Sequence, residues 1–199
     1  MLKKSLFFCM LLGCQAYSQS IEQTMNYLAT IDKIAKPVSQ SSLPVPYNYL
    51  LTQPLMTKGI ETYYQRKAFI RTIYAKKSKV SNNYSRVILM LLDENNLTKK
   101  KLVAELAFIT MNFSELPENL IADVLHTNIP FGKLLITYHV KTASINRSYF
   151  VIQCNRLISS LSHCKLNTKI YGRRNMLIRT DNKRWVAKTI EILPDLILP

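Results

Sequence analysis

The sequence has little that could hold a metal ion. Its three histidines, His126, His139 and His163, share no spacing, and neither a Cys-x-x-Cys nor a His-Glu-x-x-His pattern occurs. Zinc ligands usually recur in such patterns. No internal repeat and no low-complexity tract is present either, which favours a globular protein with one domain of ordinary size. We therefore expect no metal and no other cofactor.

Acidic residues are also scarce. The chain has 12 Asp and Glu against 27 Lys and Arg, which gives a formal net charge of +15. Such a surplus favours an anionic partner: nucleic acid, an anionic lipid surface or a carboxylate ligand. The basic residues are spread over turns expected near 76–79, 99–101 and 183–184, without a helix-turn-helix or zinc-finger pattern. We therefore expect no nucleic-acid partner.

The N-terminal residues resemble an export signal. Lys3 and Lys4 precede an apolar run over 6–12, which is shorter than the roughly 20 residues that span a bilayer. Two processing sites compete. Residues 1–18 form a signal peptide if cleavage follows Ser18; alternatively, the leader ends at residue 13 and Cys14 becomes a lipidated membrane anchor. The other interpretation is a buried N-terminal helix or strand. We expect an exported protein, periplasmic or secreted.

Two cysteines, Cys154 and Cys164, remain in the body of the chain. In an oxidising compartment such a pair is a candidate disulfide. Two buried thiols are the alternative, because the sequence does not determine the distance between the two residues.

Hydrophobic periodicity predicts helices first and strands later. A helix and a connector are expected over 19–46, and a domain over 47–199. That domain begins with a helix that Pro54 and Gly59 interrupt within 47–65. Ser114 is expected to cap a helix that has Pro117 in its first turn. Further segments follow the strand and helix patterns: strands over 69–75, 86–92, 101–111, 144–153, 171–180 and 184–193, and a short helix over 133–138. We expect an α+β fold in which helices pack on a mainly antiparallel sheet of about six strands.

Several short motifs in this order resemble the chorismate lyase family, whose members release pyruvate from chorismate to form 4-hydroxybenzoate. The resemblance covers residues 50–194. The motifs that carry it are Pro54-Leu55-Met56-Thr57-Lys58, Arg86 at the start of an apolar strand, Val103-Ala104-Glu105, Leu116-Pro117, Ile129-Pro130-Phe131-Gly132-Lys133-Leu134-Leu135, Arg147, Gly172-Arg173-Arg174 and Ile190-Glu191-Ile192-Leu193-Pro194.

The resemblance implies roles for six residues. Glu191 would move the proton and Arg86 would hold a substrate carboxylate, since a guanidinium can bind a carboxylate through two hydrogen bonds. A second set would bind the substrate: Arg147, Met56, Gly132 and Leu134. The ligand implied is a small aromatic carboxylate.

Each role has a structural alternative. Arg86 could cap the sheet edge, Arg147 could pair with Glu105 across the sheet, and Gly132 could serve the turn alone. Glu191 could face solvent, because a shift of one residue reverses the face of a strand. Arg173 and Arg174 would lie on opposite faces as surface charge.

Two functions remain open. The first is a chorismate–pyruvate lyase that yields 4-hydroxybenzoate or an isomer. The second is an exported binder of small aromatic carboxylates that uses the same fold without catalysis, because an exported enzyme would be separated from cytosolic chorismate. The sequence leaves the oligomeric state open.

Overall fold

The structure is a computed structural model that describes residues 31–93 and 102–194. The chain divides into two units, residues 1–35 and residues 36–199. In the first unit the described helix is α2 (Ile31–Ile34). The predicted leader, its cleavage sites and Cys14 lie outside the described residues. No helix within 31–93 or 102–194 is long and apolar enough to cross a membrane.

The second unit contains a seven-stranded antiparallel sheet with the strand order β1-β5-β6-β7-β4-β3-β2. Its strands are β1 (Lys36–Val38), β2 (Ala68–Lys77), β3 (Asn83–Leu92), β4 (Leu102–Asn112), β5 (Thr142–Gln153), β6 (Lys169–Arg179) and β7 (Trp185–Leu193). The predicted α+β class with an antiparallel sheet is confirmed. The additional strand is β1, which pairs with β5 at the edge of the sheet, a position that tolerates Pro37.

The helices of this unit are short. They are α3 (Tyr47–Leu50), α4 (Met56–Tyr64), α5 (Glu118–His126), α6 (Phe131–Thr137) and α7 (Arg156–Ser162), with 3-10 turns η1 (Gln40–Ser42) and η2 (Phe113–Glu115). The interruption predicted within 47–65 is confirmed at Pro54, which lies between α3 and α4, but not at Gly59, which lies inside α4. The capping prediction was wrong in detail: the Asn112 side chain caps η2, and Pro117 is itself the N-cap residue of α5.

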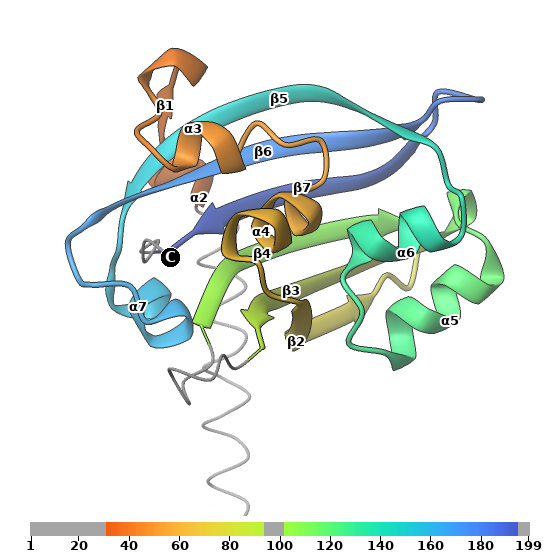
Figure 1. The fold of residues 1–199 in the computed structure, drawn as a ribbon. Helices are drawn as coiled ribbons and strands as arrows, with labels where there is room; N and C mark the ends of the chain where they lie inside the picture. The colour runs from red at the N-terminus through yellow and green to blue at the C-terminus, as the bar shows by residue number, and fades with distance from the viewer. Residues whose placement is uncertain (1–30, 94–101, 195–199) are drawn as a thin grey trace, which may run out of the picture. The chain divides into compact units, whose positions relative to one another are not determined.

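Helices α3, α4, α5 and α6 lie over one face of the sheet (Figure 1). Two clusters of buried side chains join them to it. One cluster packs α5 and α6 against β3, β4, β6 and β7, and the other packs α3 and α4 against residues of the same sheet. Because strand residues alternate between faces, every second residue of these strands points toward the helices.

Cys154 and Cys164 form a disulfide, with their Cα atoms 6.2 Å apart. Both side chains are buried. The bond closes the segment that holds α7 between β5 and β6. It resolves the choice that the sequence left between a disulfide and two thiols.

Candidate functional site

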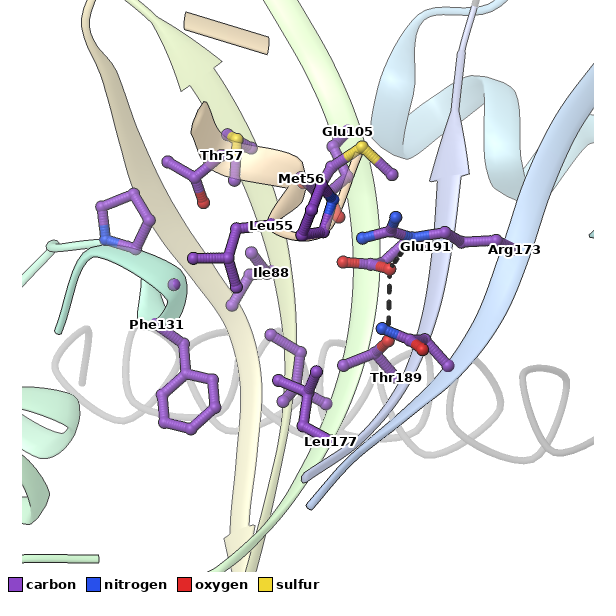
Figure 2. A pocket seen from close by; sticks show the side chains of 16 residues that line it. Leu55, Met56, Thr57, Ile88, Glu105, Phe131, Arg173, Leu177, Thr189 and Glu191 are labelled. Atoms are coloured by element: carbon purple, nitrogen blue, oxygen red, sulfur yellow. Dashed lines mark hydrogen bonds and ion pairs between the residues drawn. The ribbon is translucent and has the colours of Figure 1, made fainter. Parts of the chain in front are cut away.

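A small enclosed cavity lies between the sheet and the N-terminal ends of α4 and α6 (Figure 2). Its volume is about 40 Å³, room for on the order of one to three water molecules. Ligand pockets usually measure about 300–1,000 Å³, so this cavity is smaller than a ligand pocket of ordinary size. The residues that line it are Pro54, Leu55, Met56, Thr57, Ile88, Met90, Glu105, Ile109, Pro130, Phe131, Gly132, Arg173, Asn175, Leu177, Thr189 and Glu191.

Strand register explains why polar side chains gather at one end of this cavity. Glu191 on β7 is paired with Arg173 on β6, and Thr189 is paired with Asn175 in the next row that faces the helices. Glu105 enters from β4, the strand on the other side of β7. Since the β6–β7 and β4–β7 pairings are both antiparallel, one register brings residues from three strands to a single place.

Arg173 is the centre of this polar group. Its side chain is 1% exposed, and its Nε donates to Glu191 Oε2 at 2.5 Å. Its Nη1 donates to the backbone carbonyls of Leu51, at 2.9 Å, and of Gln53. Burial lowers the pKa of Arg173, but the charge and the hydrogen bond of Glu191 outweigh this effect, and the net shift is upward. Arg173 therefore connects the sheet to the segment between α3 and α4.

Glu191 faces the cavity and not solvent. Its residue exposure is 8%, and its Oε2 accepts hydrogen bonds from Arg173 and from the Thr189 hydroxyl, at 3.2 Å (Figure 2). The alternative that Glu191 faces solvent is therefore wrong for this structure. A carboxylate with these two donors is held in one orientation.

Glu105 is the second carboxyl group of the cavity. Its residue exposure is 2%, and its Oε2 has no hydrogen-bond partner. Burial raises the pKa of Glu105 well above its usual value, and the nearby charge of Glu191 raises it further, while Arg173 lowers it by less. Burial and the neighbouring Glu191 therefore both favour the protonated form of Glu105.

A further polar chain leads from the cavity to Arg147. Asn175 lines the cavity with an unpartnered Oδ1, and its Nδ2 donates to Ser144 Oγ at 3.2 Å. Arg147 donates to the same hydroxyl at 2.9 Å and to the Thr52 carbonyl at 2.7 Å. Arg147 does not line the cavity, and these contacts replace the cross-sheet pair with Glu105 that the sequence had left open.

The remaining residues proposed from the resemblance are divided between the cavity and the core. Met56 at the start of α4 and Gly132 in the first turn of α6 line the cavity. Leu134 is 1% exposed and packs in the core beneath α6 without lining the cavity.

Arg86 lies on the same face of the sheet, next to the cavity. It precedes Ile88 by two residues on β3, so the two share a face, and it is paired with Ile109 on β4; both isoleucines line the cavity. Its side chain is 1% exposed, and its Nη1 donates to the Val124 carbonyl of α5 at 3.2 Å. Its Nε and Nη2 have no partner, and burial lowers the pKa of Arg86 to about 10. It is a buried cation with spare donors.

Two residues of the polar group escaped the sequence analysis. Arg173 was interpreted as surface charge, and Glu105 was considered only as a partner for Arg147. Strand parity alone could not have identified them, because Glu105 joins Arg173 and Glu191 only through the register of β4 and β6 with β7. Among residues 31–93 and 102–194, no group of three or more His, Cys, Asp or Glu is placed to hold a metal ion.

No protein-family model matches the sequence, and no curated protein matches it. Solved structures do match. PhnF from Mycobacterium smegmatis is 8% identical, with a TM-score of 0.55 over 89% of this chain and 80% of PhnF. The effector domain of PhnF is 7% identical, with a TM-score of 0.52 over 80% of this chain and 92% of that domain. The gene product SA0254 from Staphylococcus aureus is 9% identical, with a TM-score of 0.52 over 72% of this chain and 89% of that protein.

These likenesses show the fold. It is the fold of PhnF and of the effector domain of PhnF. They also correct one prediction. Transcriptional regulators are among the matched structures, and the partner of such regulators is DNA. The prediction that nucleic acid is not a partner was therefore wrong. The absence of a DNA-binding motif in a basic sequence was not sufficient evidence to exclude DNA.

Proposed function

We propose that this chain is a small-molecule-binding protein whose ligand occupies the cavity under α4 and α6, and that the ligand is a small aromatic carboxylate. The observation that carries the proposal is the buried polar group of Arg173, Glu191 and Glu105 at one end of an otherwise apolar cavity. Ligand sites commonly combine an apolar wall with a few oriented polar groups. The effector-type fold supports the same role.

Polar groups in and beside the cavity match the two functional groups of such a ligand, a hydroxyl and a carboxylate. A ligand hydroxyl can exchange a hydrogen bond with Glu105, whose Oε2 has no partner. A carboxylate is best matched by Arg86, which has unpartnered donors and lies two residues before Ile88 and opposite Ile109, both of which line the cavity. Because the cavity is now too small, binding requires α6 or the start of α4 to move away from the sheet.

A lyase reaction is the second candidate, and the pair of carboxyl groups at the polar end favours it. Elimination of pyruvate from chorismate breaks the ether C–O bond, removes a ring proton as the ring becomes aromatic, and protonates the departing enolpyruvate. Glu191, held by Arg173 and Thr189, is the group suited to accept the ring proton, and a neutral Glu105 is suited to supply one. Arg86 would hold the ring carboxylate; Arg147 could hold the second only after leaving Ser144 and the Thr52 carbonyl, because it does not line the cavity.

Two measurements on the full chain separate these functions. Calorimetry with 4-hydroxybenzoate tests binding, and chromatography after incubation with chorismate tests turnover. We expect binding to be lost in Ile88→Phe, which fills the cavity, and kept in Ile136→Phe, whose side chain is exposed on α6. Binding without turnover supports the binding protein. Release of a hydroxybenzoate and pyruvate, lost in Glu191→Gln, supports the lyase. No binding by the wild type, or equal binding by both phenylalanine variants, overturns the cavity as the site.

A further inference from the structure

The polar end of the cavity contains two carboxyl groups and one buried cation. Arg173 donates through Nε to Glu191 and through Nη1 to the carbonyls of Leu51 and Gln53. Glu105 lies on the same face, two residues along β4 from the register partner of Glu191. Its Oε2 lines the cavity without a hydrogen-bond partner. The Arg173 guanidinium therefore forms its hydrogen bonds with Glu191 and with the backbone, and none with Glu105.

In the part of the chain that the structure describes, no cation besides Arg173 acts on Glu105. The charged groups that act on it are Glu191 from β7 and Arg173 from β6. The residues that line the cavity beside it from β3 and α4 are Met90, Met56 and Thr57, none of which titrates. A second buried negative charge would cost several kcal/mol in such a place. Two carboxylates close together relieve this cost by keeping one proton.

We propose that Glu105 and Glu191 form a carboxyl pair that keeps one proton on Glu105, and that this neutral acid makes the polar end of the cavity select a ligand hydroxyl over a second anionic group. The proposal rests on the proposed function for the identity of the ligand. The protonation of Glu105 stands on the geometry of the free protein and is tested separately.

The selection follows from hydrogen-bond capacity. A protonated Glu105 can donate one hydrogen bond and accept others. A phenolic hydroxyl donates and accepts, so it can satisfy Glu105 without adding charge. A carboxylate only accepts and would add a charge beside Glu191. The site should therefore prefer 4-hydroxybenzoate to benzene-1,4-dicarboxylate, although the two molecules share a ring and one carboxylate.

The first experiment needs no ligand. The unfolding free energy of the full chain is measured by urea denaturation between about pH 5 and pH 8, for the wild type and for Glu105→Gln. The native protein keeps a proton that the unfolded chain releases above about pH 4.3, so the unfolded state binds fewer protons and stability falls as the pH rises. One such proton changes the unfolding equilibrium by up to about ten-fold per pH unit.

Glu105→Gln keeps the shape of the side chain and is neutral at every pH. The decrease of the unfolding free energy with rising pH should therefore be smaller in this variant than in the wild type. Glu61→Gln is the matched control. Glu61 pairs with Lys133 on the partly exposed side of α4, and its variant should keep the wild-type slope. Equal slopes in the wild type and in Glu105→Gln would show that Glu105 is ionised and would overturn the proposal.

The second experiment measures selectivity by calorimetry with the two aromatic acids. The wild type should bind 4-hydroxybenzoate more tightly, and the affinity should weaken at high pH as Glu105 loses its proton. In Glu105→Gln the preference should persist without that pH dependence. Tighter binding of the dicarboxylate at every pH overturns the selection. Binding of neither acid, together with the expected difference in stability slopes, overturns the proposed ligand while leaving the carboxyl pair supported.

Discussion

Gly172 is the position at which one added methyl group should damage both the fold and the site. A Cβ atom there would lie 2.5 Å from Phe150 Cζ and 2.6 Å from the Glu191 carbonyl oxygen. Phe150 is fully buried and the carbonyl belongs to the backbone of β7, so neither can turn away. Because Arg173 follows Gly172 and Glu191 is its ion-pair partner, the strain falls directly on the polar end of the cavity.

The size of the effect can be estimated from overpacking. Forcing a methyl group into a packed core costs about 1–3 kcal/mol, which for a chain of this length lowers the Tm by about 2–12 °C. We expect Gly172→Ala to show this loss in calorimetry or thermal circular dichroism. Binding of 4-hydroxybenzoate should weaken as well, because the Glu191 carbonyl and side chain are displaced together.

Gly132→Ala is the matched control. Its Cβ would lie 3.4 Å from Thr57 Oγ1 and 3.8 Å from Leu55, which are tolerable contacts, and alanine is the better helix former by up to about 1 kcal/mol. We expect this variant to be as stable as the wild type or slightly more stable. A Gly172→Ala protein with an unchanged Tm would refute the packing argument at β5, β6 and β7.

Three further changes test the buried charges and the disulfide. Arg173→Met should lower the unfolding free energy in urea by about 3–5 kcal/mol, because it leaves Glu191 as a buried charge without its partner; a loss below about 1 kcal/mol would contradict the burial of that pair. Arg86→Met should change the unfolding free energy by less than about 1 kcal/mol or raise it, since two guanidinium nitrogens already lack partners, yet it should abolish binding of 4-hydroxybenzoate; retained affinity would remove Arg86 from the site. Reduction of the bond between Cys154 and Cys164 should lower stability by about 2–3 kcal/mol in paired urea titrations with and without reductant, as expected for a loop closed over 10 residues; identical midpoints would count against a formed bond in the native protein.

Much of the fold followed from local pattern. The apolar run that begins at Arg86 and the β-branched segments near both ends of the domain predicted strands, and Pro54 predicted the break between α3 and α4. These signals depend on neighbouring residues, so they can be recognised without knowing what packs above them. The edge strand β1 could not be recognised this way, because three residues with a proline have no periodicity and form a strand only when β5 lies beside them.

The site was only partly accessible to the same reasoning. Met56, Gly132 and Glu191 were placed by resemblance, and the structure puts all three on the cavity. Arg86 and Leu134 were also proposed, and the structure places them under α5 and α6, just outside it. A residue that belongs to a matching motif need not line the cavity. The position of the helices over the sheet determines where the cavity lies, and the motif does not specify that position.

The sequence by itself determined the charge surplus, the class of fold and the alternation that sets Arg173 and Arg174 on opposite faces. Only the tertiary structure decided that Arg173 is buried and bound to Glu191, 18 residues away along the chain, and that Glu105 joins them from a third strand. The physical reason is register. Antiparallel pairing fixes which residues stand opposite each other, and the helices packed above then decide which of those pairs are removed from water.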